Sequence, residues 1–191
     1  GVNEKIEKDV IDGVRYPLRV GHISMLAGMK SASYQNAVVL VLNHAFEQYL
    51  ELGPFMADMI KKEIKLGCLL IIAKSFSAEF VGQIAQVSQG AKMPVILSYA
   101  DLHTETFEDI ASYVDATYLD TSPRIGKSIR NLNKFEYSGR AKKIVVTEKE
   151  LTLIGGQGKE AVFKYEKVTS AVQERIDQIK KQIEEEKDEK E

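Results

Sequence analysis

Short apolar runs divide the middle of the chain into candidate strands. Residues 37–42 and 69–73 are continuous apolar runs, and residues 93–97 form a third that is interrupted by a single proline. Short continuous apolar runs are typical of strands that are buried on both faces of a sheet. The pattern therefore predicts three buried strands at these positions.

Helical patterns alternate with these strands. Residues 55–65, 78–89 and 105–114 carry apolar residues at mixed three- and four-residue spacings. Pro54 suits the first turn of the first helix, and Ser77 is a good N-cap for the second. Alternating strands and helices are typical of parallel strands joined by crossover helices, so the middle of the chain predicts an α/β fold.

The C-terminal third has a different pattern. Residues 142–147 and 151–154 are two apolar or alternating runs with charged residues between them, which predicts a β-hairpin. We expect residues 155–158 (GGQG) to form a turn after it. Val168 and the isoleucines that follow recur every three or four residues, which predicts a long helix over residues 167–187. A short strand is expected at residues 116–119.

Composition and charge exclude several classes of protein. The 191 residues carry 26 Lys and Arg against 28 Asp and Glu, a formal net charge of −2, which is unlike a dedicated nucleic-acid binder. No apolar run approaches the ~20 residues that a membrane span needs, and the first residues lack a signal-peptide pattern. The single cysteine, Cys68, lies in an apolar run and is expected to be a buried, inert thiol. We expect one soluble cytoplasmic domain over residues 1–191, with neither nucleic acid nor membrane as a partner.

The search for catalytic groups yields one candidate cluster. Asp101, Glu105, Glu108 and Asp109 lie close in sequence to His103. A solvated helix start explains this cluster, and a small α/β enzyme with an acidic and histidine site is the alternative. No histidines stand at metal-ligand spacing, so we expect no metal or cofactor in the chain itself.

Apolar residues are also in excess on two of the predicted helices. On the first helix Phe55 and Met59 form one stripe and Met56 and Ile60 form an adjacent one, where packing on a sheet requires only one. The second helix is similarly apolar. Flexible methionines suit a surface that binds varied partners. A wide core face, as in a structural scaffold, is the competing interpretation.

Several motifs resemble the apical domain of the group I chaperonins, the GroEL family. The strongest are GRAKKIVV at residues 139–146, TLIGGQGKE at 152–160 and VQERIDQIKKQIE at 172–184. The segments DGVRY at 12–16, LLIIA at 69–73 and EDIA at 108–111 fit the same pattern less closely. The resemblance implies sheet layers flanked by two apolar helices, followed by the hairpin and the long helix. It also implies that residues 1–12 and 185–191 are flexible ends that lead toward an intermediate domain.

The resemblance implies a function as well. In this family the apical domain binds exposed apolar segments of unfolded polypeptides and the mobile loop of a co-chaperonin, within an ATP-driven ring. ATP and Mg belong to the equatorial domain of the full-length protein, so this chain alone is expected to be a monomer without enzymatic activity. Cytoplasm is the expected location, and a divergent member could equally be organellar or virus-encoded.

The implied polypeptide-binding residues follow from matching segments. VGHISMLA at residues 20–27 corresponds to the family's RGYLSPYF, and the helix that begins GPFM at residue 53 corresponds to its first binding helix. The second binding helix corresponds to residues 78–89. The residues expected to contact clients are His22, Leu26, Ala27, Phe55, Met56, Met59, Ile60, Val81, Ile84 and Ala85.

The chain departs from the family at one loop and in its aromatic content. The family's PGFGDRR loop is replaced by YADLHTE at residues 99–105. The segment at residues 20–27 carries fewer aromatic residues than its counterpart. These departures bear on whether a standard co-chaperonin binds, and they leave client binding as the main expectation.

Overall fold

The computed structural model describes residues 13–90, 93–123, 125 and 135–157. The strands of its main sheet are β1 (Gly13–Tyr16), β2 (Arg19–Val20), β3 (Ser31–Asn43), β5 (Cys68–Ala73), β7 (Val95–Tyr99), β8 (Leu119–Asp120), β9 (Gly139–Thr147) and β10 (Leu151–Gln157). A separate pair is formed by β4 (Ala45–Phe46) and β6 (Ser75–Phe76). The helices are α2 (Gly53–Lys61), α3 (Ala78–Gly90) and α4 (Thr104–Val114), with 3₁₀ turns η1 (Ile23–Leu26), η2 (Tyr49–Glu51) and η4 (Phe135–Tyr137).

The sheet combines a parallel centre with antiparallel flanks. Its strand order is β1-β10-β9-β3-β5-β7-β2, and β8 pairs with β3 off this path. Strands β3, β5 and β7 are parallel, which confirms the prediction made from the three apolar runs. Strands β9 and β10 form the predicted antiparallel hairpin.

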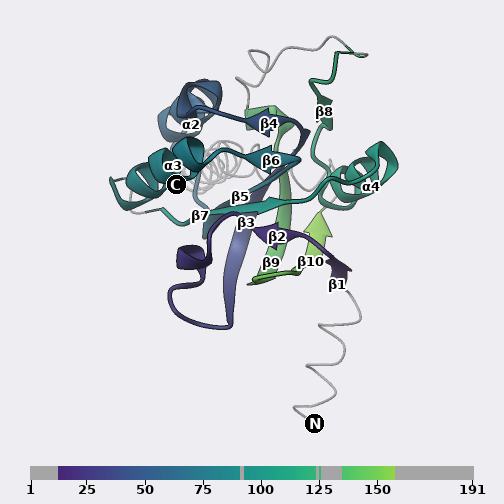
Figure 1. Cartoon of the computed structure of the whole chain (residues 1–191), viewed down its shortest axis with the longest axis horizontal. Coiled ribbons are helices and arrows are strands. Elements are labelled where there is room, and N and C mark those ends of the chain that lie inside the picture. Colours follow the sequence, from purple (N-terminus) through teal and green to yellow (C-terminus); the bar gives the residue numbers. More distant parts are fainter. Residues whose placement is uncertain (1–12, 91–92, 124, 126–134, 158–191) are drawn as a thin grey trace, which may run out of the picture.

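Two apolar cores lie on the two faces of the sheet. Helices α2 and α3 cover one face, where Phe55 and Phe80 are fully buried against β3 and β5. Helix α4 covers the other face through Phe107 and Ile110. Figure 1 shows α2 and α3 together, with α4 well apart from them. Alternate side chains of the central strands enter alternate cores, which explains why β5 and residues 37–42 of β3 are apolar at every position.

The sheet curls so that its two ends come together. Strands β1 and β2 stand at opposite ends of the strand order, yet only two residues, Pro17 and Leu18, connect them. The N–H of Val20 donates to the carbonyl of Glu148 at the β9–β10 turn, at 3.1 Å. Leu18 is fully buried in the core that the curled sheet encloses.

The alternation of side chains changes phase within β3. Ala32 and Tyr34 pack against the α4-side core, whereas beyond Asn36 it is Ala37 and Val39 that do so. Asn36 has a φ of 54°, a left-handed conformation that asparagine adopts more readily than most residues. The prediction of residues 37–42 therefore captured only the second half of the strand, because the first half is polar on its outer face.

The glycines after the hairpin do not form the expected turn. Residues 155–157 lie within β10, so the turn predicted at residues 155–158 is wrong over its first three residues, and Gly158 lies outside the described residues. Gly155 has a φ of 63°, and a Cβ there would lie 2.8 Å from the Lys142 side chain. A Cβ on Gly156 would collide with the Tyr113 carbonyl oxygen. Close approach of neighbouring chain explains these glycines.

The start of α3 follows the sequence pattern closely. Ser77 caps α3 as predicted, since its Oγ accepts from the Phe80 N–H at 3.0 Å. The strand expected at residues 116–119 is largely wrong, because only Leu119 of that range lies in a strand, the two-residue β8. The long helix predicted over residues 167–187 and the ends at residues 1–12 and 185–191 lie outside the described residues.

Candidate functional site

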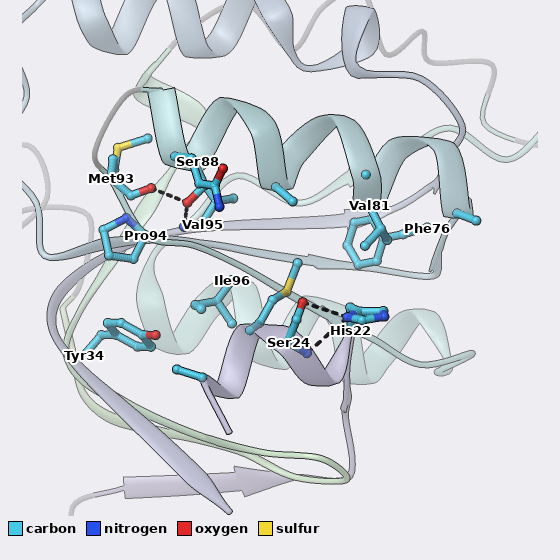
Figure 2. Close-up of a pocket in the computed structure, with 17 residues that line it drawn as sticks. His22, Ser24, Tyr34, Phe76, Val81, Ser88, Met93, Pro94, Val95 and Ile96 are labelled. Carbon is cyan, nitrogen blue, oxygen red and sulfur yellow. Dashed lines mark hydrogen bonds between the residues drawn. The ribbon is translucent and has the colours of Figure 1, made fainter. Parts of the chain in front are cut away.

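A pocket of about 940 Å³ lies between helix α3 and the η1 turn. Figure 2 shows α3 along one wall, η1 along the other, and β7 residues Val95 and Ile96 between them. Tyr34 of β3 and Phe76 of β6 also line the pocket. The pocket is therefore built by five elements of the fold.

The α3 wall is held by its two ends. The Ser77 cap fixes its start. Near its end, Ser88 Oγ donates to the Met93 carbonyl at 2.6 Å and accepts from the Val95 N–H at 3.3 Å. Phe80 and Ile84 are fully buried on the sheet side. The pocket side of α3 carries small or aliphatic side chains: Ala78, Val81, Gly82 and Ala85.

The η1 wall is held against β7. The Gly21 N–H donates to the Leu97 carbonyl at 2.6 Å, and a Cβ on Gly21 would lie only 2.6 Å from the Leu97 Cβ. His22 caps the turn, because its Nδ1 accepts from the Ser24 N–H at 3.1 Å and lies 2.7 Å from Ser24 Oγ. Ala27 ends the turn in a left-handed conformation.

The pocket lining carries no Asp, Glu, Lys or Arg among its described residues. This is informative in a chain whose residues are 28% charged. Burial raises the pKa of Tyr34 further above its ordinary value of 10.0, with a smaller contribution from Cys68, so the hydroxyl is neutral like the rest of the lining. Phe76 stacks on Phe80 at 5.5 Å between ring centroids and links the lining to the core. The pocket suits an uncharged, largely apolar partner.

The structure brings four of the ten expected client-binding residues together in this pocket. His22 and Ala27 come from the η1 wall, and Val81 and Ala85 come from α3. Val81 is half-buried, while His22, Ala27 and Ala85 are exposed. Leu26, by contrast, points into the core and is only 2% exposed.

The expectation of exposed apolar stripes on the first helix is wrong for most of its residues. Phe55, Met56 and Met59 are buried, and only Ile60 is exposed, at 61%. The reason is that α2 packs on the sheet and also against η4. Phe55 stacks on Phe135 at 6.4 Å, and the Phe135 N–H donates to the Asp58 side chain of α2 at 3.0 Å. Ile84 on α3 is likewise buried.

Several lining residues escaped the sequence reasoning. They are Tyr34, Phe76, Met93 and Pro94. Ala32 and Tyr34 alternate with polar residues in this segment. That alternation is a strand pattern that could have extended the predicted strand toward residue 31 and placed Tyr34 on its inner face. No comparable local signal marks Phe76, because its position depends on the pairing of β6 with β4.

The alternative acidic and histidine site does not assemble as a pocket. Asp101, His103 and Asp109 are all exposed. His103 precedes α4, and its side chain makes no capping hydrogen bond. Within the described ranges, no group of three or more His, Cys, Asp or Glu side chains is arranged to hold a metal ion. Over the same ranges, no helix is long and apolar enough to cross a membrane.

Cys68 is buried as predicted. Its side chain lies at the start of β5 with no exposed surface. Burial raises the pKa of the Cys68 thiol to about 12. The reactive thiolate is therefore scarce at neutral pH, which argues against a nucleophilic role.

The fold is that of a chaperonin domain. Two crystal structures of the chaperonin gp146 from the bacteriophage EL 2 (Pseudomonas aeruginosa), both in the presence of ATP-BeFx, match 91% of this chain with a TM-score of 0.61 and 14% identity. The match covers 31% and 32% of those chains.

A sequence relative is of the same class. The chain is similar to chaperonin GroEL 3 of Psychromonas ingrahamii, with 26% identity over 127 residues, which is 64% of this chain and 22% of that protein. No protein-family model matches the sequence. The fold and sequence likenesses together support a divergent GroEL-like chaperonin domain. This chain spans about a fifth to a third of the length of these proteins.

Proposed function

We propose that this domain binds exposed apolar segments of unfolded polypeptides in the pocket between α3 and η1. The observation that carries the proposal is the convergence of His22, Ala27, Val81 and Ala85 on one uncharged pocket. The likeness to GroEL-type chaperonins supports a protein-folding chaperone role. Leu26 and Ile84, which are buried, would support the two pocket walls from behind.

Burial of apolar surface supplies the affinity in this proposal. Removing apolar surface from water contributes about 25 cal/mol per Å². Ordering an unfolded segment offsets much of that gain, so a single pocket would bind at roughly micromolar strength. Several copies arranged in a ring would bind one client more tightly through multivalency.

The remaining functions of the whole protein are part of the same proposal. ATP and Mg would act in an equatorial domain, and this chain by itself would not hydrolyse ATP. The full-length protein would form a ring in the cytoplasm, whereas the isolated domain would be a monomer. A co-chaperonin loop would compete with clients for the same pocket.

The α2 residues have a different part in this proposal. Phe55, Met56 and Met59 form the core beneath α2. Ile60, which is exposed, is the α2 residue available for direct contact with a client. Its contribution would be secondary, because it does not line the pocket.

Two pocket variants test the proposal. Val81→Glu and Ala85→Glu place a carboxylate in an uncharged pocket, where its desolvation opposes the binding of an apolar segment. We expect each to weaken binding of a fluorescently labelled, reduced and alkylated unfolded protein at least tenfold, measured by anisotropy. Ile60→Glu is the control for added charge on an exposed helix, and its effect should be smaller.

Circular dichroism and urea unfolding establish that each variant is folded. If the folded Val81→Glu and Ala85→Glu proteins bind the probe as tightly as the unsubstituted protein, the pocket is not the client site. If all three glutamate variants weaken binding equally, recognition extends over the α2 face instead.

A further inference from the structure

Tyr34 places a hydroxyl group in the pocket without a partner of its own. The residue lies on β3 opposite Ile144 of β9, and its ring is half-buried against the α4-side core. Within the described ranges the Tyr34 hydroxyl makes no hydrogen bond. It is not one of the fully buried polar atoms that lack a partner, so it remains accessible from the pocket. In Figure 2 the ring lies at the side of the lining below Pro94, with its hydroxyl on the side that faces Ile96.

The other polar side chains of the described lining are either hydrogen-bonded already or exposed. Ser88 Oγ donates a hydrogen bond to the Met93 carbonyl and accepts one from the Val95 N–H. Ser24 and His22 are paired with each other, and both are exposed. Gln89 lies at the exposed rim. Among the side chains of the described lining, the Tyr34 hydroxyl is therefore the half-buried hydrogen-bond donor that is free to bind a ligand.

We propose that Tyr34 donates a hydrogen bond to a main-chain carbonyl of the bound polypeptide. This inference rests on the proposed function and specifies how the same pocket recognises its ligand. A tyrosine hydroxyl is a neutral donor at neutral pH, and it is matched by a neutral acceptor. The uncharged lining disfavours a carboxylate as that acceptor, because the pocket offers no basic side chain to pair with it.

A main-chain carbonyl fits a ligand of varied sequence. Every residue of a polypeptide carries a carbonyl, whereas polar side chains occur only at some positions. The aliphatic α3 wall would receive apolar side chains, and Tyr34 would fix the backbone between them. The arrangement selects for polypeptide over other apolar molecules without selecting for a particular sequence.

The Tyr34→Phe variant removes only the hydroxyl and preserves the ring. We expect binding of the unfolded-protein probe to weaken three- to tenfold, since one neutral hydrogen bond is lost. Urea unfolding should show an unchanged midpoint. Tyr49→Phe is the matched control, because Tyr49 is half-buried on η2 and outside the pocket. It should leave binding unchanged.

A second ligand separates hydrogen bonding from pocket shape. Diphenylhexatriene is a fluorescent hydrocarbon without an acceptor, so its affinity for the pocket should be the same in the Tyr34→Phe variant. Loss of dye and polypeptide binding together would show that the hydroxyl only shapes the pocket, and this result overturns the inference. Unweakened polypeptide binding by Tyr34→Phe also overturns it. The proposed function fails separately, if Val81→Glu leaves polypeptide binding intact.

Discussion

The Arg140 guanidinium donates a hydrogen bond to the side-chain oxygen of Asn36 at 3.2 Å, and so joins β9 to the position where β3 changes phase. The Asn36 side chain also donates to the Lys65 carbonyl at 3.3 Å, and its own carbonyl accepts from the Gly67 N–H at 2.8 Å. Arg140 itself is only 2% exposed. These contacts hold the left-handed residue that turns the first half of β3, including Tyr34, toward the pocket.

Substitutions at Asn36 separate its backbone role from its side-chain role. Asn36→Ala loses the hydrogen bonds and forces an alanine into a positive φ, which should lower the free energy of unfolding by about 2–3 kcal/mol. Asn36→Gly loses the same hydrogen bonds but adopts this φ without strain, so it should cost roughly 1 kcal/mol less. Urea denaturation of both variants measures the difference. A glycine variant less stable than the alanine variant would contradict this account of the strand.

Two glycines offer a matched pair of alanine substitutions. A Cβ on Gly156 would collide with the Tyr113 carbonyl, so Gly156→Ala should destabilise the domain by about 1–3 kcal/mol through overpacking. A Cβ on Gly82, within α3, would meet nothing within 4 Å. Gly82→Ala should stabilise by about 0.5–1 kcal/mol, because alanine favours a helix over glycine. We expect the thermal unfolding midpoints of the two variants to move in opposite directions. Two shifts of the same sign would contradict the view that Gly156 is crowded and Gly82 is not.

The Cys68 thiol should resist modification in the folded domain. Burial both excludes reagent and raises the pKa of the Cys68 thiol to about 12, which leaves little thiolate at pH 8. Iodoacetamide should therefore leave the mass of the folded protein unchanged over an hour and add one adduct in denaturing urea. Rapid alkylation without urea would mean that the start of β5 opens readily.

Asp120 should make the domain sensitive to acid. Burial acts to raise the pKa of Asp120, but hydrogen bonds from Ser122, Asn43 and Tyr118 outweigh it and lower that pKa below its ordinary value of 3.8. A depressed pKa in the folded state stabilises the fold above the unfolded pKa, and the contribution is lost as the pH falls through the folded pKa. Asp120→Asn should therefore be less stable than the unsubstituted protein at pH 7. The deficit should shrink below about pH 4.

Urea unfolding at pH 7 and at pH 3 measures this change. Glu150→Gln is a suitable control, because the Glu150 side chain is half exposed and pairs loosely with Arg15 at 3.7 Å. Its stability should differ little from that of the unsubstituted protein at either pH. A constant deficit for Asp120→Asn at both pH values would show that the carboxylate charge makes no contribution.

The buried parallel strands could be predicted because their signal is local. Residues 69–73 are apolar at every position, and both faces of β5 enter a core. The start of β3 could not be predicted from a continuous apolar run, since its residues alternate between exposed and half-buried. The phase change at Asn36 further disguised the pattern, because the period of two is broken in the middle of the strand.

The candidate site was predictable only in part, for a physical reason that α2 illustrates. A second apolar stripe on a helix indicates a second contact, but the pattern does not say whether a client or the chain itself makes that contact. In this domain η4 makes it, through Phe135, which follows Phe55 by 80 residues. Val81 and Ala85 of α3 were predicted from the family resemblance rather than from the apolar pattern, and both line the pocket.

The neighbouring positions of β1 and β10 have a mechanical consequence. Gly13 pairs with Ile154, so the first and last described strands run side by side in opposite directions at one end of the strand order. Because β10 also pairs with β9, both strands are tied by hydrogen bonds into the sheet that carries the pocket. A force applied at this edge would therefore be shared by the successive strand ladders between β1 and β7, and β7 carries the pocket residues Val95 and Ile96.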